Sequence, residues 1–345
     1  LGALADWLAP RLGDRPVLEA RGRPGSGYSA ENLIVSATVG ATDRRLVLRR
    51  ETRDAPIYPE QAPGLSTGVA LQHRAMRSVA DTVPVAGIIG FESDRSVLGV
   101  PFFVMDHVDG DVPVENPSYA SAGFFADAGP EARRAVVGNG LAVLARLHTV
   151  PWADTDLVVL DAPGTTPGEA RQLEVWETSL RQALRGRRGE LLDDALVWLH
   201  GRLPPDPGPD AVVLSWGDAR LGNMIWRDSA CVCVTDFEGV ALGTRELDVG
   251  WWLMCDRWMH EGSGAARLDG EPTRPEQRRL YAEAAGVRLG DTQWCEVFSA
   301  VRFATTVVHV MNRWEAHGLV AADHLIWRDN PATEVLGMLM DEATA

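Results

Sequence analysis

Three polar side chains within residues 215–250 have the types and the spacing that phosphoryl transfer requires. Asp218 follows a glycine after an apolar run, Asn223 lies five positions later, and Asp236 lies thirteen positions after Asn223. In this chemistry one carboxylate accepts the proton of the attacking hydroxyl, while an amide oxygen and a second carboxylate hold the metal ions at the nucleotide phosphates. Each residue alone is an ordinary turn former, but the three together indicate a phosphotransferase site.

The elements around these residues would bring them to one point. Short apolar runs predict strands over residues 212–215, 223–227 and 231–237, with loops between them. A hairpin between the second and third runs would return Asp236 to the end at which Asn223 lies.

The first hundred residues predict a sheet with one helix. Apolar or alternating runs at 33–39 and 45–49 flank a Gly-Ala-Thr-Asp turn, which predicts a hairpin. Apolar residues at helical spacing predict a helix over 69–80. The run at 97–108 predicts a further strand, which Gly110 ends.

The chain changes in character after this point. A polar insertion with several prolines and glycines occupies 113–129, and beyond residue 246 the pattern is mainly helical. Between them, amphipathic patterns predict helices over 130–149, 171–185 and 190–203. The sequence therefore predicts an α+β fold with two lobes, a β-rich lobe at 1–107 and an α-rich lobe at 108–345.

The composition excludes several classes of protein. The 345 residues carry 33 basic and 48 acidic side chains, for a net charge of -15, and every basic residue is arginine because the chain has no lysine. An acidic surface argues against a nucleic-acid partner, since a phosphate backbone attracts cations. The absence of lysine excludes a Schiff base and a P-loop lysine.

The cysteines and the apolar runs indicate the cellular compartment in which we expect the protein. No apolar run approaches the roughly 18–20 residues of a membrane span, and the first residues show no signal-peptide pattern. The four cysteines have no metal-binding or disulfide spacing, and Cys231 and Cys233 are interpreted as core residues of a strand. We therefore expect a cytoplasmic protein with no membrane partner. The sequence does not predict its oligomeric state.

Two motifs resemble those of a known family. The stretches GDARLGNMIWRD at 217–228 and DFEGVALGTRELDV at 236–249 resemble the aminoglycoside phosphotransferase family of the protein-kinase-like superfamily. The closest likeness is to the branch that resembles the kinase portion of acyl-CoA dehydrogenase fusions. Weaker likeness extends to VLGVPFFVMDHVDG at 97–110 and LARLHTV at 144–150.

The resemblance implies a protein-kinase-like bilobal fold and a role for each motif residue. Asp218 would be the catalytic base, and Asn223 and Asp236 would be the Mg²⁺ ligands. The donor would be ATP or GTP, bound by the N-terminal lobe. The acceptor would be a hydroxyl of a small molecule, either an aminoglycoside-like antibiotic or a hydroxylated metabolite such as a hydroxyacyl compound.

The resemblance also places the nucleotide against a glycine-rich loop, a strand and the hinge between the lobes. The residues concerned are Ser26, Gly27, Ser29, Val47, Arg49, Asp106, His107 and Val108. Arg49 stands where the family has a phosphate-binding lysine. With a strand period of two, Val47 would face the adenine and Arg50 would face away.

Two departures from the family pattern concern residues around the phosphates. Trp216 stands where the family has a histidine that braces the catalytic loop. The helix glutamate that orients the lysine aligns with Gln72, although Glu51 or Glu60 could serve in its place.

Three further charged residues accompany the motif. Glu238 would reach a second metal ion through water, or would be a surface carboxylate. Asp248, at a helix start, would brace the catalytic loop. Arg220 would pair with Asp236 or Glu238, or would lie on the surface.

The acceptor is expected between the insertion at 113–129 and the helices that follow Asp248. Aromatic and acidic side chains gather there, and Trp252, Asp256 and Glu261 are the predicted acceptor contacts. The wider set is Trp251, Trp252, Trp258, Trp314, Asp256, Glu261 and Glu315. Core packing is the alternative for most of these tryptophans.

Two functions remain open from the sequence. The first is an active small-molecule kinase, which the intact Asp218, Asn223 and Asp236 favour. The second is a nucleotide-binding pseudokinase that acts as an interaction module, for which the departures at Trp216 and Arg49, together with Gln72, are the support.

Overall fold

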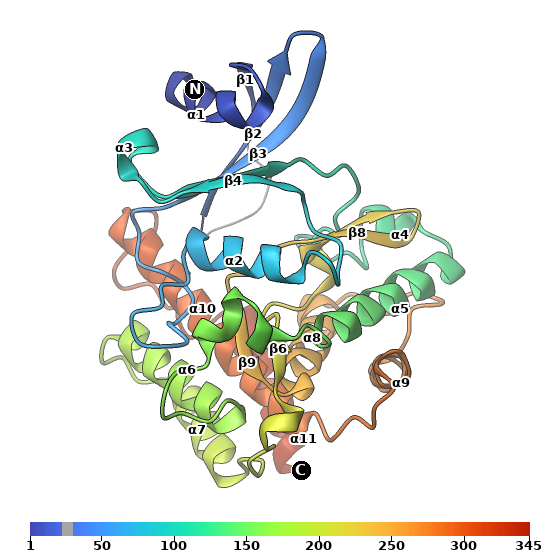
Figure 1. Ribbon diagram of the computed structural model, residues 1–345. Coiled ribbons are helices and arrows are strands. Elements are labelled where there is room, and N and C mark those ends of the chain that lie inside the picture. Colours follow the sequence, from blue (N-terminus) through green and yellow to red (C-terminus); the bar gives the residue numbers. More distant parts are fainter. Residues whose placement is uncertain (23–29) are drawn as a thin grey trace.

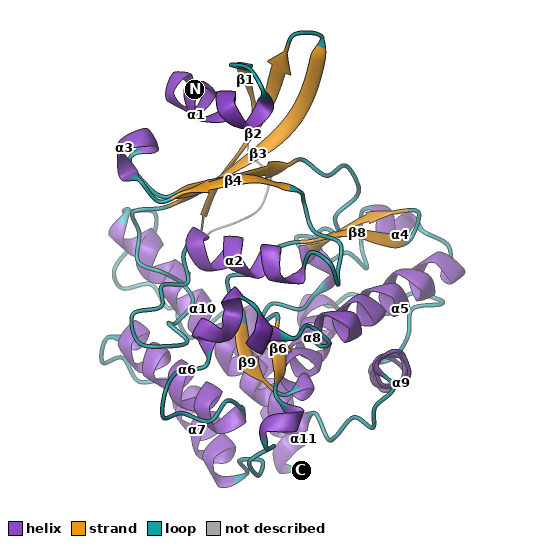
Figure 2. Ribbon diagram, viewed as in Figure 1, coloured by secondary structure: helices purple, strands orange, loops and turns teal. Residues whose placement is uncertain are grey.

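The computed structural model describes residues 1–22 and 30–345. A β-sheet lobe formed by the first part of the chain lies above a helical lobe formed by the rest, as Figure 1 and Figure 2 show. The predicted α+β, protein-kinase-like arrangement is therefore confirmed. Ser26, Gly27 and Ser29 of the predicted phosphate loop lie outside the described residues.

The N-lobe is a five-stranded antiparallel sheet in the order β1-β2-β3-β5-β4. Its strands are β1 Val17–Gly22, β2 Ala30–Val39, β3 Thr42–Glu51, β4 Ile88–Glu92 and β5 Phe102–Asp106. The predicted hairpin joins β2 to β3. Helix α2, Val69–Val79, matches the predicted helix and lies between the sheet and the C-lobe in Figure 1.

The two faces of β3 pack against different parts of the molecule. Leu46 and Leu48 lie in a small apolar core between the sheet and helix α1, Gly2–Leu12. Because successive side chains of a strand point to opposite faces, Val47 and Arg49 face the other side, toward the C-lobe.

The strand predicted over 97–108 is wrong in its first part. Residues Arg95–Leu98 form a short helix, α3. Asp94 caps its start by accepting a hydrogen bond from the Ser96 N–H at 2.8 Å, and Gly99 ends it in the left-handed conformation. These local capping signals outweigh the apolar pattern, so strand β5 begins only at Phe102.

Helices build the C-lobe around the long helix α10, which packs against α6, α8 and α11. The bounds are α4 Phe124–Asp127, α5 Pro130–Leu147, α6 Glu169–Leu184, α7 Glu190–Gly201, α8 Arg245–Met259, α9 Arg274–Ala285, α10 Gln293–Ala316 and α11 Pro331–Thr344. The helices predicted from periodicity correspond to α5, α6 and α7.

Two short antiparallel ribbons carry the phosphotransfer motif. They are β6 Val213–Ser215 with β9 Ala241–Gly243, and β7 Met224–Arg227 with β8 Ala230–Val234. The strand predicted over 231–237 therefore ends early. The chain leaves the extended conformation at Asp236, whose φ is 57°. The turn at Asp236 ends the extended chain, so Asp236 lies in the loop after β8 and not in the strand.

Short 3-10 helices complete the described elements, at Trp152–Asp154, Asp156–Leu160, Pro209–Ala211, Leu221–Asn223 and Glu261–Ser263. Within residues 1–22 and 30–345, no helix is both long and apolar enough to cross a membrane.

Candidate active site

Asp218 lies in a tight loop that follows β6. Gly217 before it has a φ of +80°, and a Cβ at this position would lie 1.9 Å from the backbone oxygen of Gly239. Only glycine fits such an approach of two backbones. The loop that carries Asp218 is therefore pressed against the segment that follows Asp236.

The carboxylate of Asp248, in the first turn of α8, holds this loop from below. Its Oδ1 accepts hydrogen bonds from the Ser215 hydroxyl at 2.9 Å and the Gly217 N–H at 2.8 Å. Its Oδ2 accepts from the Trp216 N–H at 2.7 Å and lies 3.0 Å from His148 Nε2. The predicted bracing role of Asp248 is confirmed.

His148 extends this buried network toward α9. Its Nδ1 lies 2.6 Å from the Tyr281 hydroxyl, and both side chains are buried. Burial by itself would raise the pKa of Asp248, but the hydrogen bond and charge of His148 and the two loop N–H groups hold that pKa below its usual value. His148 is therefore part of the core and supports Asp248 from inside the C-lobe.

Trp216 joins the catalytic loop to the segment that contains Asp236. The indole is fully buried, and its Nε1 donates to the backbone oxygens of Thr235 at 3.0 Å and Asp236 at 3.1 Å. The indole thus braces this loop through a single shared donor, at the position where the family has a histidine.

The two oxygens of the Asp218 carboxylate have different environments. Oδ1 accepts hydrogen bonds from Trp251 Nε1 and Arg220 Nε, both at 2.9 Å. Oδ2 accepts from the Tyr58 hydroxyl at 3.3 Å. Burial, together with the negative charge of Asp236, raises the pKa of Asp218 to about 7.

The pairing predicted for Arg220 is wrong. Its guanidinium binds Asp218 and Glu115, in place of Asp236 or Glu238. The physical reason is that Arg49 from the N-lobe already occupies those two carboxylates. Sequence alone could not place a strand residue between them.

Asn223 and Asp236 lie beside Asp218, as their spacing predicted. The Asn223 side-chain amide donates to the Asp218 backbone oxygen at 3.0 Å. The N–H and hydroxyl of Thr235 donate to the Asn223 backbone oxygen at 2.9 Å and 3.0 Å, which fixes the neighbouring Asp236 next to Asn223. Asp236 itself has a left-handed backbone, an uncommon conformation for a residue other than glycine.

Arg49 connects the two lobes at this point. One guanidinium nitrogen, Nη2, lies 3.1 Å from Asp236 Oδ1 and 2.5 Å from Glu238 Oε1. Burial opposes the charged form, but Asp236 and Glu238 outweigh it and raise the pKa of Arg49. Glu238 is 4% exposed, so the surface alternative for it is wrong. Arg50 faces away and pairs with Glu31.

The oxygen donors near Arg49 fit a magnesium ion. Mg²⁺ prefers carboxylate and amide oxygens and keeps several waters. Asp236 supplies a carboxylate whose side chain is 26% exposed, so water can reach it. Because the Asn223 amide nitrogen is held by the Asp218 backbone, the opposite side of that amide presents its oxygen. Both residues could therefore hold the metal.

The predicted hinge, residues 106–108, begins at the last residue of β5. The N–H groups of Asp106 and His107 donate to the backbone oxygens of Gly87 at 2.8 Å and Arg45 at 3.0 Å. Val47 on β3 is buried and pairs with Met105 of β5, next to this segment. The structure thus places the predicted adenine contacts Val47 and 106–108 close together along β3 and β5.

The predicted acceptor residues Trp252 and Asp256 have protein partners. Trp252 is buried, and its indole donates to Gln277 Oε1 at 2.7 Å. Asp256 accepts from Arg267 Nη2 at 2.5 Å and from Gln277 Nε2 at 2.7 Å. Glu261 pairs with Arg274 at 2.6 Å. Asp256 and Glu261 thus belong to an ion-pair network with arginines, while Trp252 and Asp256 also line one pocket with Arg220, the partner of Asp218.

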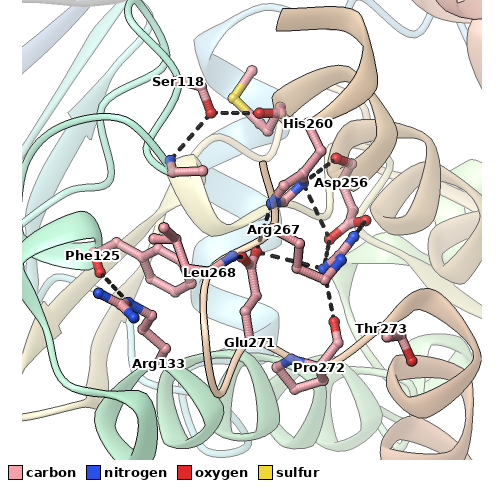
Figure 3. Close-up of polar contacts among 12 residues, drawn as sticks. Ser118, Phe125, Arg133, Asp256, His260, Arg267, Leu268, Glu271, Pro272 and Thr273 are labelled. Atoms are coloured by element: carbon pink, nitrogen blue, oxygen red, sulfur yellow. Dashed lines mark hydrogen bonds and ion pairs between the residues drawn. The ribbon is translucent and has the colours of Figure 1, made fainter. Parts of the chain in front are cut away.

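Figure 3 shows that Asp256, His260 and Glu271 point toward one another. Their possible ligand atoms lie within 4.8 Å of one another, and His260 Nε2 is 2.9 Å from Glu271 Oε1. Arg267 lies against both carboxylates. Because arginine already supplies the positive charge that a metal ion would bring, this cluster is best described as a buried salt-bridge network.

Three residues of the site could not be found from the sequence. Tyr58 comes from a loop after β3, Glu115 from the polar insertion, and Arg302 from α10. Arg302 Nη2 donates to the Gly217 backbone oxygen at 2.5 Å, and its guanidinium lies 4.6 Å from the Trp251 ring centroid. No local motif marks these residues, because the fold alone brings them to Asp218.

A sequence model of the phosphotransferase enzyme family matches residues 22–294, which is most of the chain. The chain belongs to this phosphotransferase family. The resemblance read from the motif around Asp218 is therefore confirmed, and the chain is an enzyme of the small-molecule kinase class.

Curated relatives agree with the expected branch. This chain is 24% identical over 310 residues to an Arabidopsis thaliana protein named Probable acyl-CoA dehydrogenase IBR3, covering 84% of this chain and 36% of that one. It is 27% identical over 231 residues to Acyl-CoA dehydrogenase family member 11 of Mus musculus, covering 64% of this chain and 28% of the relative. This chain thus spans about a third of the length of these relatives.

Solved structures show the same fold. A candidate aminoglycoside phosphotransferase from Ralstonia eutropha has a TM-score of 0.73 and 23% identity, with 99% of this chain and 97% of that one covered. Spectinomycin phosphotransferase in complex with ADP and spectinomycin has a TM-score of 0.53 and 11% identity, with 99% and 97% covered.

Proposed function

We propose that the chain transfers the γ-phosphate of ATP or GTP to a hydroxyl of a small molecule, in a Mg²⁺-dependent reaction with Asp218 as the base. One observation carries this proposal. Asp218, Asn223 and Asp236, which are separated in the sequence, meet at one point, and Asp236 pairs there with Arg49 from the other lobe.

The base follows from the environment of Asp218. Trp251 and Arg220 hold Oδ1 and fix the plane of the carboxylate. Oδ2 is then the oxygen that accepts the proton of the attacking hydroxyl. A positioned carboxylate of this kind typically contributes a factor of about 10²–10⁴ to the rate.

The nucleotide would lie between β3 and the hinge. Arg49 would bind the α- and β-phosphates, and its fork suits phosphate oxygens. Val47 would contact the base. The N–H groups of Asp106 and His107 are used within the sheet, so the Val108 N–H is our choice for the hinge donor. Ser26, Gly27 and Ser29 would cover the phosphates.

The metal would be held by Asp236 and Asn223, and would neutralise charge on the phosphate oxygens when bound. Glu238 and Asp236 keep Arg49 in position for the same phosphates. Both carboxylates therefore serve the donor side of the reaction, which leaves Asp218 for the acceptor side.

The acceptor class follows the family. One structural neighbour is a spectinomycin phosphotransferase and another is a macrolide 2'-phosphotransferase. For this chain we propose an aminoglycoside-like antibiotic or a hydroxylated metabolite. Acceptor contacts from Trp252, Asp256 and Glu261 stay a prediction, because each of these side chains would have to leave its present protein partner in order to bind the acceptor.

All four cysteines are free thiols, which suits a reducing cytoplasm.

Thermal denaturation with ATP or GTP, with and without Mg²⁺, combined with a turnover screen over hydroxylated compounds, tests the proposal. Asp218→Asn should keep nucleotide stabilisation and lose about 10²–10⁴ in turnover. Unchanged turnover would remove Asp218 from the role of base. Nucleotide stabilisation without turnover on any hydroxyl would favour the pseudokinase alternative.

A further inference from the structure

Tyr58 lies in the catalytic centre although it belongs to the N-lobe segment that follows β3. Its hydroxyl is 3.3 Å from Asp218 Oδ2. Its ring is edge-on to Trp176, with the centroids 5.9 Å apart. A Cβ on Gly239 would lie 3.1 Å from the tyrosine ring, so the ring also packs against the backbone after Asp236. The side chain thus contacts the base and packs on the backbone three residues after the proposed metal ligand Asp236.

The oxygen that Tyr58 contacts is the one that a phosphate acceptor needs. Oδ1 of Asp218 already accepts two hydrogen bonds, from Trp251 and Arg220. The hydroxyl of any acceptor must therefore approach Oδ2, within hydrogen-bond reach. Tyr58 presents a hydroxyl at that place.

Burial and the negative charges around Tyr58 keep its hydroxyl protonated, so this hydroxyl needs a base before it can react. Burial, followed by the negative charges of Asp218, Asp236 and Glu238, raises the pKa of Tyr58 well above its usual range. The phenol is therefore neutral and can attack phosphorus only as its proton leaves. The nearest carboxylate oxygen is Oδ2 of Asp218.

Contacts to the C-lobe hold Tyr58 in this position. We call residues 52–68 the docked segment. Arg313 Nη2 of α10 donates to the Ala55 backbone oxygen at 2.6 Å, and Gln172 Nε2 of α6 donates to Gln61 Oε1 at 2.8 Å. The Thr67 hydroxyl donates to the Tyr58 backbone oxygen at 3.1 Å. Seating the hydroxyl therefore does not depend on a second molecule.

We propose that Tyr58 is a phosphorylation site for the chain's own active centre, with a nucleoside triphosphate as the donor. This inference rests on the proposed function. The Tyr58 oxygen forms a bond to the γ-phosphorus while the bond from that phosphorus to the β,γ-bridging oxygen breaks. The phenol proton passes to Asp218 Oδ2, and the nucleoside diphosphate leaves.

The phosphorylated Tyr58 side chain cannot stay beside Asp218 Oδ2. A phosphate adds a charge of about -1.5 to -2 at neutral pH, next to Asp218, Asp236 and Glu238. A cavity of about 490 Å³ beside Tyr58 is lined by Arg53, Arg95 and Arg313 as well as by Glu51, Asp54 and Glu238, so the phosphorylated side chain has room to withdraw from Asp218 and Asp236 toward arginines. The reaction should therefore stop after one phosphate per chain and leave Oδ2 open.

Incubation of the full chain with [γ-³²P]ATP and Mg²⁺, without any added acceptor, tests the inference. Trypsin cleavage after Arg53 and Arg74 releases residues 54–74, in which Tyr58 is the single tyrosine. Mass spectrometry of this peptide should show phosphotyrosine. The fraction labelled at a given time should not change with protein concentration, because the hydroxyl and the base share one chain.

Matched variants decide the assignment. Tyr58→Phe should lose the label on peptide 54–74 and keep ATP binding in the thermal shift, and Asp218→Asn should lose the label as well. Tyr119→Phe removes another buried tyrosine hydroxyl and should keep the label. Tyr28→Phe should also leave phosphate on peptide 54–74.

Two results overturn the inference while the proposed function stands. The first is Asp218-dependent turnover of ATP without phosphate on Tyr58. The second is labelling that rises in proportion to protein concentration, which would mean transfer between chains. Absence of both ATP binding and turnover would instead remove the proposed function, and this inference with it.

Discussion

Replacing Asp248 by asparagine should destabilise the chain and disable the loop that carries Asp218. Each carboxylate oxygen of Asp248 binds one backbone N–H and one side chain. Oδ1 accepts from the Gly217 N–H and the Ser215 hydroxyl, and Oδ2 accepts from the Trp216 N–H and lies next to His148. The two side chains can adjust to an altered partner, whereas the two backbone N–H groups are fixed. The amide has a single acceptor oxygen. Whichever way it turns, its NH₂ group faces one of the two N–H donors.

The magnitude follows from this count. A buried N–H left without an acceptor costs about 1–3 kcal/mol, and the remaining bonds lose the extra strength that a charged acceptor gives. We expect a loss of about 2–4 kcal/mol in the free energy of unfolding. Turnover should fall in parallel, because Gly217 directly precedes Asp218.

Urea denaturation at several pH values measures this, with Glu246→Gln as the control. Glu246 lies in the same first helical turn and accepts from the Gly290 N–H at 2.9 Å. Its replacement should cost less than about 1 kcal/mol. An equal or larger loss in the control would refute the reasoning, because the effect would then come from the helix dipole.

The pH dependence gives a second check. The pKa of Asp248 is held below its usual value in the folded chain. Its stabilising contribution is therefore fully present above the unfolded pKa of about 3.9 and is lost as the pH falls through the folded pKa. The stability difference between the parent chain and Asp248→Asn should therefore shrink as the pH falls below about 4. A difference that grows in acid contradicts this assignment.

The remaining predictions concern the nucleotide and the catalytic loop. Asp236→Ala should abolish the Mg²⁺-dependent part of the ATP thermal shift, and a shift that survives in full would exclude Asp236 as the ligand. Arg49→Ala should weaken binding of ATP but not of adenosine in calorimetry, Arg49→Lys should restore part of it, and Arg50→Ala should have the smaller effect. Gly217→Ala should destabilise by more than about 2 kcal/mol in urea. Gly13→Ala has a similar φ, +88°, but open space around its Cβ, so it isolates the clash.

Local sequence signals were sufficient to predict that Asp218, Asn223 and Asp236 lie close together on the C-lobe. The sequence separations among Asp218, Asn223 and Asp236 predict that these residues lie close together, because the hairpin between Asn223 and Asp236 is short and returns the chain to the end where it started. The bracing role of Asp248 was predicted from the family resemblance, in which an acidic residue stands at this helix start.

Competition among local signals limited the prediction elsewhere. The apolar run from Val97 predicts a strand, but the Asp94 cap and Gly99 turn its start into a short helix. Arg220 was given the wrong partner because the prediction treated the motif as isolated, while Arg49 from the sheet takes both carboxylates.

The sequence by itself determined the class of chemistry, the two-lobed α+β fold and the residues of the motif, because these depend on periodicity and on short-range spacing. The tertiary structure alone decided what surrounds Asp218. Tyr58, Trp251 and Arg302 come from a loop and two helices that are far apart in the chain, and no local pattern encodes that meeting. Tertiary packing also decides that Oδ1 of Asp218 is held by protein donors, while Oδ2 is left to accept the proton of a hydroxyl.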